Sequence, residues 1–248
     1  MGRREQHRAE LRTLDATHWP AYLRERSGLP GPRGNIELAQ AVADEGDRAR
    51  FDQFIATDDE YPVFCGVLGL GRLLAEGSDV EQRLRGHATD ERWRVREAVA
   101  MALQRLGDAD LPRLLDLVAD WAADPHPLVQ RAAVAGVCEP RLLKTSHAAA
   151  RAVEVCTRVT EALASRPADE RADAGVRALR QALKSRSACN GSMPAPGTAV
   201  RMPARGALRP PKSEHSGKRR IIESHDYSNK LRHLHDAIIE PPRDHWRP

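Results

Sequence analysis

Apolar residues recur along the chain at the three- and four-residue spacing that is typical of amphipathic helices. This spacing predicts helices around residues 3–15, 36–45 and 47–59, with Asn35 placed to cap the second helix and Gly46 to end it. The clearest apolar face consists of Val95, Ala98, Val99, Ala102 and Leu106. The pattern as a whole predicts an all-α protein.

The hydrophobic pattern repeats with a period of 32 to 34 residues. The aligned aspartates are Asp58, Asp90 and Asp124, the valines that follow are Val63, Val95 and Val129, and the small residues after them are Gly66, Ala98 and Ala132. Periods of this length mark arrays of helical hairpins, in which each hairpin buries its apolar face against its neighbours. We therefore expect a stack of about four to five helix pairs.

The hairpin that starts near residue 90 shows how each unit is expected to fold. Asp90 is placed to cap its first helix and Gly107 to end it. The inward residues of the second helix are expected to be Leu111, Leu114, Leu115 and Val118. Tyr61 in one copy and Trp93 in the next occupy the same position, and this recurrence favours a packing role for both aromatic rings.

Two segments resemble a known repeat. Residues 90–103, DERWRVREAVAMAL, resemble the first helix of a HEAT repeat, and residues 124–137, DPHPLVQRAAVAGV, resemble the next copy. The resemblance to HEAT-repeat (armadillo-type) proteins covers roughly residues 35–183. It implies a right-handed α-solenoid of antiparallel helix pairs, but it does not by itself imply a reaction.

The chain divides into three parts on composition. Residues 1–34 are interpreted as an N-terminal helix and a Pro/Gly-rich linker, residues 35–183 as the solenoid, and residues 184–248 as a mostly disordered tail with a short helix at 228–239. The tail holds 13 of the 39 basic residues but 6 of the 35 acidic residues, a net charge of +7. Residues 1–183 therefore carry −3, which weakens any inference from the overall charge of +4 to nucleic acid.

Composition and motifs argue against several classes of protein. No stretch of 18 apolar residues or secretory signal is present, and no pair of the four cysteines forms a CxxC motif, so we expect reduced thiols in the cytoplasm and no membrane partner. The glycines of GVLGLGR fall inside a predicted helix rather than in a phosphate-binding loop. No GxSxG or HExxH motif occurs, and the sequence predicts no metal, cofactor or catalytic residue.

The favoured function is that of a non-enzymatic scaffold or adaptor that binds a protein partner on a concave surface. Polar positions of one hairpin are the candidates for that surface. They are Arg92, Arg96, Gln104, Arg105, Arg113, Asp116 and Asp120. A third possibility is a HEAT-type lyase that acts on cofactors attached to other proteins, but no residue of the sequence specifically supports it.

A DNA-binding protein is the alternative. Residues 126–143, HPLVQRAAVAGVCEPRLL, are similar to a segment of the HEAT-like DNA alkylation-repair glycosylases, although Gln130 stands where that pattern has a basic residue. The resemblance implies a basic, tryptophan-bearing surface and a carboxylate at the lesion. The candidates for this surface are Arg83, Arg85, Arg92, Trp93, Arg96, Trp121 and Asp124. Ion pairing with nearby acids is the simpler interpretation of the arginines among them.

Overall fold

The computed structural model describes residues 2–31 and 33–187, and this part of the chain contains eleven α-helices and no strand. The prediction of an all-α fold is confirmed. The basic tail beyond residue 187, with the helix expected at 228–239, lies outside the described residues. The helices are α1 (Arg3–Thr13), α2 (Trp19–Arg26), α3 (Ile36–Glu45), α4 (Arg48–Ile55), α5 (Glu60–Leu73), α6 (Ser78–His87), α7 (Trp93–Ala109), α8 (Leu111–Ala122), α9 (Pro127–Val137), α10 (Ser146–Ala164) and α11 (Ala174–Ser187).

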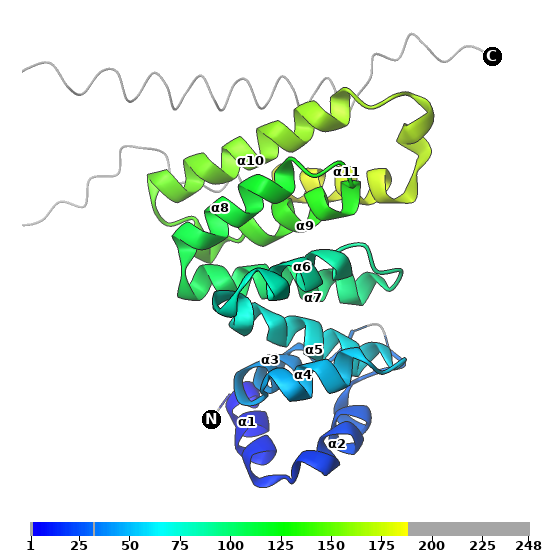
Figure 1. Cartoon of the computed structure of the whole chain (residues 1–248), viewed down its shortest axis with the longest axis vertical. Coiled ribbons are helices and arrows are strands. Elements are labelled where there is room, and N and C mark those ends of the chain that lie inside the picture. Colours follow the sequence, from blue (N-terminus) through cyan, green and yellow to red (C-terminus); the bar gives the residue numbers. More distant parts are fainter. Residues whose placement is uncertain (1, 32, 188–248) are drawn as a thin grey trace, which may run out of the picture.

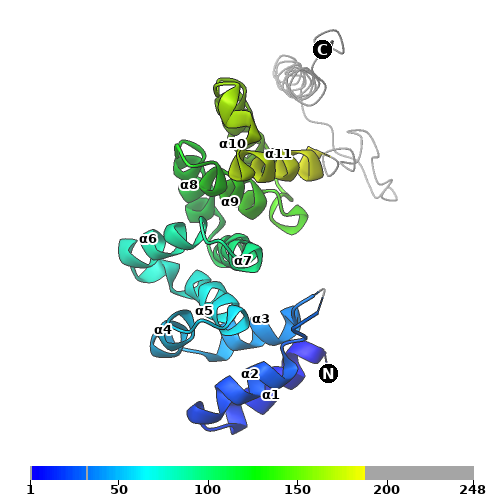
Figure 2. The ribbon, with the colours of Figure 1, turned by 90° about the vertical axis from the view of Figure 1, so that its right-hand side faces the viewer.

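The helices form an elongated stack of two layers (Figures 1 and 2). In the first layer, α3, α5, α7, α9 and α11 each contact the next helix of the series. The second layer consists of α4, α6, α8 and α10, which pack against the helices of the first layer. At the lower end of Figure 1, α1 packs on α3 and α2 packs on α5. The stack is therefore built from successive hairpins, as the sequence period predicts.

The predicted repeat is confirmed by equivalent positions in three first-layer helices. Val63, Val95 and Val129 all lie in the first turn of their helices, α5, α7 and α9, and all are buried. Between them, small residues allow close approach: a Cβ atom added at Gly71 would lie 2.5 Å from the carbonyl oxygen of Ala102 on α7. Close contact between helix backbones thus contributes to the packing of a chain in which only 4% of the residues are aromatic.

The start and end of α7 differ from the expectation. Asp90 does not cap α7, because the N-cap residue is Arg92; instead Asp90 accepts the N–H of Arg92 in a turn that precedes the helix, at 2.8 Å. Gly107 does not end α7, which continues to Ala109. A Cβ atom at Gly107 would lie 2.6 Å from the side chain of Leu114, so this glycine serves close packing inside the helix rather than termination.

The Pro/Gly-rich stretch near the N-terminus contains a helix, α2, that the sequence analysis did not predict. Pro20 lies in the first turn of α2, where backbone N–H groups have no partner within the helix, so the N–H that proline lacks costs no hydrogen bond. Trp19 and Leu23 are buried, and the guanidinium of Arg50 lies 3.9 Å from the centre of the Trp19 ring. Helix α2 is thus held by packing rather than by a strong local helical pattern.

The close contact between α5 and α7 predicts how two glycine substitutions differ. We expect Gly71→Ala to lower the free energy of unfolding by about 1–3 kcal/mol, because its new methyl group meets the backbone of Ala102. The matched control is Gly86→Ala on α6, where no atom lies within 4 Å of the added Cβ, and helix propensity should raise stability by about 0.5–1 kcal/mol. Urea unfolding measures both; equal effects at the two positions would contradict the packing described.

Candidate protein-binding edge of the helix stack

The first helices of four hairpins begin side by side along one edge of the first layer, which we call the leading edge. The hydroxyl of Tyr61, in the first turn of α5, donates to the carbonyl of Asn35, the N-cap of α3, at 2.7 Å. Arg94 of α7 pairs with Glu60 of α5 at 2.9 Å, and Arg131 of α9 pairs with Glu97 of α7. The starts of α3, α5, α7 and α9 are therefore joined in sequence by one hydrogen bond from a side chain to the backbone and two ion pairs between side chains.

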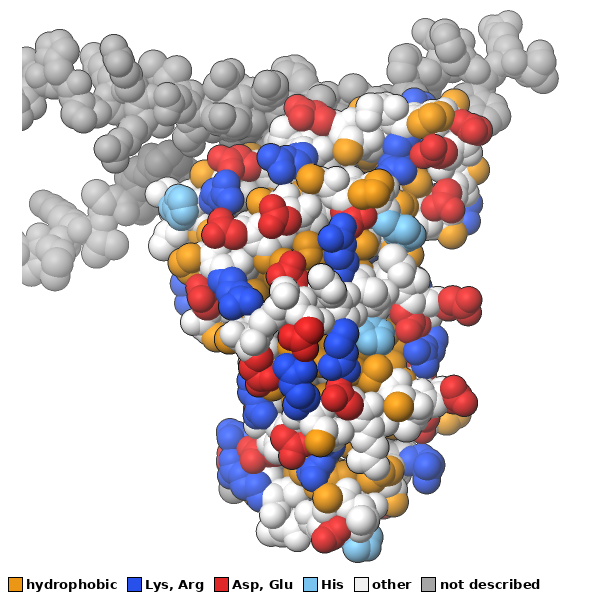
Figure 3. All heavy atoms as spheres, viewed as in Figure 1, with side chains coloured by type: hydrophobic (Ala, Val, Ile, Leu, Met, Phe, Trp, Pro, Cys, Tyr) orange, Lys and Arg blue, Asp and Glu red, His pale blue; other side chains and the backbone are white. Residues whose placement is uncertain are grey.

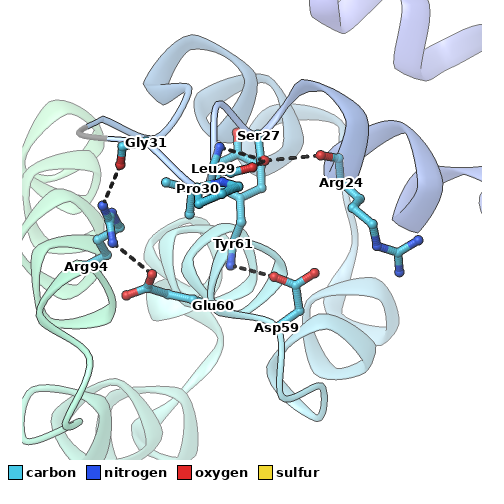
Figure 4. Close-up of a pocket in the computed structure, with 9 residues that line it drawn as sticks. All are labelled: Arg24, Ser27, Leu29, Pro30, Gly31, Asp59, Glu60, Tyr61 and Arg94. Carbon is cyan, nitrogen blue, oxygen red and sulfur yellow. Dashed lines mark hydrogen bonds and ion pairs between the residues drawn. The ribbon is translucent and has the colours of Figure 1, made fainter.

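A cavity of about 450 Å³ opens at the leading edge (Figure 4). Its lining residues are Arg24, Ser27, Leu29, Pro30, Gly31, Asp59, Glu60, Tyr61 and Arg94. Arg94 crosses one side of the cavity and donates both to the carboxylate of Glu60 and to the carbonyl of Gly31, at 2.9 and 3.0 Å. The loop before α3 and the first turns of α5 and α7 thus meet around one space.

Several of the polar groups that line the cavity have partners within the protein. Burial raises the pKa of Tyr61, so its hydroxyl stays protonated and acts as a donor to Asn35. A carboxylate oxygen of Asp59 accepts the backbone N–H of Tyr61 at 3.2 Å. Glu60 and Arg94 pair with each other. These contacts hold the side chains of Asp59, Glu60, Tyr61 and Arg94 in place, and the four side chains shape the cavity.

Two large hydrophobic side chains are exposed at the same edge. Trp93, the first residue of α7, is 52% exposed, and Ile36, the first residue of α3, is 44% exposed. The guanidinium of Arg94 lies 4.8 Å from the centre of the Trp93 ring, a cation–π arrangement that restrains the ring. The leading edge therefore presents an exposed apolar residue on each side of α5.

The predicted packing role of Trp93 is wrong, although the equivalent Tyr61 is buried. The difference arises from the connection that precedes the neighbouring first-layer helix, α3 for Tyr61 and α5 for Trp93. Gly34 lies against the ring of Tyr61, and Asn35, at the end of the same connection, accepts its hydroxyl. Only residues 56–59 connect α4 to α5, so the next repeat has no comparable loop to cover Trp93.

The arginine cluster around the start of α7 is engaged in contacts within the protein. The ion pairs are Arg83–Asp52, Arg85–Asp124, Arg92–Asp90 and Arg94–Glu60. Arg96 donates to the carbonyls of Asp90 and Glu91, at 2.6 and 2.8 Å. Four of these five arginines thus form ion pairs within the protein, and Arg96 binds backbone carbonyls. In Figure 3, blue and red side chains alternate over the face in view and do not form a single basic strip.

The structure does not bring the predicted partner-binding residues onto one surface. Gln104 donates to the carbonyl of Ala135 on α9 at 3.1 Å, and Arg113 donates to the carbonyl of Leu74. Asp116 and Asp120 are exposed on α8, in the second layer. The candidates therefore divide between residues of α7 and α8 that make contacts within the stack and exposed positions on α8.

Arg105, another of these candidates, is a bridge within the first layer. Its side chain is 14% exposed and donates to Gln40 at 2.6 Å and to Asp44 at 2.7 Å, both on α3. Arg4 of α1 binds the same carboxylate of Asp44. Burial alone would raise the pKa of Asp44, but the hydrogen bonds from Arg105 and Arg4 outweigh it and hold the pKa below its ordinary value.

Two of the residues predicted for a DNA-binding surface, Trp121 and Asp124, are buried. Trp121 is 1% exposed and belongs to the core between the layers. Asp124 is buried, accepts the N–H of His126 at 2.7 Å and pairs with Arg85. Neither side chain is positioned to contact a base without rearrangement.

Sequence reasoning missed Ile36 and Glu60, although one signal could have revealed Glu60. Arg94 follows Glu60 by 34 residues, and Arg131 follows Glu97 by 34 residues. This spacing is within two residues of the length of a repeat, so an acid and an arginine about one period apart occupy neighbouring helices of the stack. The exposure of Ile36 had no comparable signal, because it depends on where the preceding loop runs.

Comparison with known proteins gives one match. Residues 65–138 match the family model of HEAT repeats, which spans α5 from its second turn to the residue after α9. No curated protein and no solved structure matches the chain. Within the described residues, no helix is long and apolar enough to cross a membrane.

Arg105 is predicted to support the fold rather than a partner. We expect Arg105→Gln to lower the free energy of unfolding by about 1–3 kcal/mol, because Asp44 loses a charged hydrogen-bond partner in a mostly buried setting. Asp116→Ala is the matched control, since that side chain is 83% exposed and should change stability by less than about 0.5 kcal/mol. Urea unfolding of the two variants beside the wild type tests this; a stable Arg105→Gln variant would refute the bridge.

The lowered pKa of Asp44 predicts an acid-dependent part of the stability. The carboxyl has a pKa of about 3.9 in the unfolded chain and a lower one in the folded protein, so ionised Asp44 stabilises the fold. Its contribution is complete above the unfolded pKa and is lost as the pH falls through the folded pKa. We expect Asp44→Asn to be less stable at pH 7 and to lose less stability than wild type between about pH 5 and pH 2. Thermal melts across this range measure the difference, and parallel pH profiles would exclude the assignment.

Proposed function

We propose that this chain, whose residues 65–138 match HEAT repeats, is a non-enzymatic scaffold that binds a protein partner at the leading edge. Arrays of helical repeats present extended surfaces that commonly bind other proteins. The observation that carries the proposal is the exposed ring of Trp93 beside the cavity. We also propose a cytoplasmic location, because no two of the four cysteines form a CxxC motif and reduced thiols are expected in that compartment.

The leading edge has the composition of a binding site for a protein. Tryptophan is among the residues that most often dominate the energy of an interface, above all where a partner excludes water from it. Trp93 and Ile36 supply apolar area, and the cavity between the loop before α3 and the starts of α5 and α7 offers a recess for a partner side chain. The arrangement supports an apolar centre with a polar rim.

The rim contributed by the first layer is mainly acidic. Four carboxylates around the starts of α3, α5 and α7 are exposed, namely those of Glu37, Asp58, Asp59 and Glu91. Arg92 and Arg94 lie close by but are paired with acids of the protein itself. A partner segment with an apolar anchor and flanking basic residues would therefore complement this edge.

The contacts inside the cavity support binding rather than catalysis. Asp59, Glu60, Tyr61 and Arg94 each make a contact that joins parts of the fold. A general acid or base must instead be placed to reach a substrate proton. The pairing of the arginines around α7 and the burial of Trp121 likewise favour a protein partner over DNA.

The proposal predicts that Trp93→Ala abolishes partner binding without unfolding the protein. The immobilised full chain, Trp93→Ala and Asp116→Ala are compared as baits, with bound proteins quantified by mass spectrometry. We expect a protein that is retained by wild type and Asp116→Ala and falls at least about tenfold with Trp93→Ala, since loss of an aromatic anchor costs about 2 kcal/mol or more. Unchanged melting temperatures would show that the loss is local.

Two outcomes would overturn the proposal. Identical sets of captured proteins for wild type and Trp93→Ala would contradict the proposal that partners bind at the leading edge. Salt-dependent binding of labelled duplex DNA that falls in Arg92→Ala and Arg96→Ala but persists in Trp93→Ala would favour the nucleic-acid function instead.

A further inference from the structure

The α5–α7 side of the leading edge combines an exposed aromatic ring with exposed carboxylates. Trp93 is 52% exposed in the first turn of α7. Asp58 and Asp59 directly precede α5, Glu91 lies two residues before Trp93, and all three acids are exposed. Among the described residues, none of these carboxylates takes part in an ion pair. An apolar group with unbalanced negative charge beside it is therefore left at the surface.

The arginines nearest to these acids in the sequence pair with other acids. Arg92 pairs with Asp90, and Arg94 pairs with Glu60. Arg24 is exposed at the cavity, but it lies across the cavity from Arg94 (Figure 4). The α5–α7 side of the edge therefore favours an occupant that is positively charged and also carries apolar side chains.

The chain itself contains a segment with this chemistry, outside the described residues. Lys218, Arg219 and Arg220 are consecutive and are followed at once by Ile221 and Ile222. This is the one place beyond residue 187 where three basic residues are consecutive. The segment belongs to the part of the chain that carries a net charge of +7, whereas the part that holds the leading edge carries −3. Opposite charges on the two parts of one chain favour their association.

We propose that residues 218–222 bind the α5–α7 side of the leading edge of the same molecule. The three basic side chains of the segment face Asp58, Asp59 and Glu91, and its two isoleucines cover the ring of Trp93. This inference rests on the proposed function, because it takes the leading edge to be a binding surface, and it adds how access to that surface is controlled.

The connection to the segment is long enough to reach the edge. Ser187 ends α11, and 31 residues separate it from Lys218, a length that can extend to about 100 Å. Helix α11 is about 21 Å long, and it is linked to α5 through α9 and α7. With neighbouring helices about 10 Å apart, these three steps add about 30 Å. The available chain is thus about twice the path that it has to cover.

Docking within one molecule weakens the binding of an external partner without abolishing it. A tethered segment has an effective concentration on the order of 1 mM at its site. With an intrinsic Kd of about 0.1 mM, the segment occupies the edge for about nine-tenths of the time, and an external partner then binds about tenfold more weakly. The segment therefore makes the edge selective for partners that bind more tightly than it does.

Acrylamide quenching of tryptophan fluorescence in the full chain measures how well Trp93 is covered. Every protein in the comparison carries Trp246→Phe, which removes the tryptophan that lies outside the described residues. Trp19 and Trp121 are buried, so quenching reports mainly on Trp93. Acrylamide is uncharged, so substitutions that change the charge of the protein do not alter its access to the ring.

The test variant carries Lys218→Glu, Arg219→Glu and Arg220→Glu. We expect its quenching constant to exceed that of the Trp246→Phe parent by about twofold or more, because like charges drive the segment away from the edge. Added salt should raise the quenching of the parent toward that of the variant, since screening weakens ion pairs between exposed charges. The substitutions lie beyond the described residues, and the melting temperature should stay unchanged.

A matched control makes the same change of charge elsewhere beyond residue 187. Arg201→Glu, Arg205→Glu and Arg209→Glu alter the net charge equally but leave residues 218–222 intact. Quenching in this control should stay at the value of the parent, because the contact with the edge depends on one segment rather than on the total charge.

Charge reversal at the edge tests the contact from the other side. Asp58 and Glu91 are exposed, and neither is the N-cap of a helix, so Asp58→Arg with Glu91→Arg should leave the fold intact. In the parent this pair should raise quenching. In the test variant it should lower quenching to near the value of the parent, because opposite charges then face each other again.

Three results would overturn the inference. They are equal quenching in the parent and the test variant, an equal rise in the control, and a loss of coverage on tenfold dilution, which would place the segment on a second copy of the chain. Each leaves the Trp93-dependent capture of an external protein intact, because those baits share the same C-terminal residues. Capture that does not depend on Trp93 would instead overturn the proposed function, whatever the quenching shows.

Discussion

The structure depends on the burial of each first-layer helix between its two neighbours in the stack. In a helical repeat protein, a single hairpin cannot bury its own apolar face and depends on its neighbours. The close approach of Gly71 to Ala102 and the burial of Val63, Val95 and Val129 show how small residues let the helices touch along their length. Everything at the surface, including the leading edge, is positioned by this stacking.

The stacking also determines what the charged residues do. Arginines such as Arg94 and Arg105 reach across to acids on neighbouring helices, and in doing so they become part of the fold. Because their charge is neutralised within the protein, it adds little to a field that could attract DNA. What remains exposed at the leading edge is the ring of Trp93, the side chain of Ile36, several carboxylates and Arg24 beside the cavity. These features support the proposal of a protein partner, rather than nucleic acid, for the described surface.

The parts of the fold that could be predicted were those governed by local periodicity. The repeat aligned the buried valines correctly, and the cap at Asn35 follows from a residue type that accepts backbone N–H groups. The exposure of Trp93 could not be predicted, because it depends on a connection that contacts the equivalent Tyr61 and has no counterpart one repeat later. The partner of Arg105 is 61 residues away in the sequence, a separation that no local pattern reports.

Hydrogen–deuterium exchange of the full chain, followed by mass spectrometry, tests the central role of the stack most directly. Amide groups of α5, α7 and α9 should exchange slowest and at similar rates, because these helices are covered on both sides by first-layer neighbours. Those of α1, which packs on α3 at the end of the stack, should exchange faster. Faster exchange in α7 than in α1 would contradict the account, because the helix at the centre of the stack would then not be held by its neighbours.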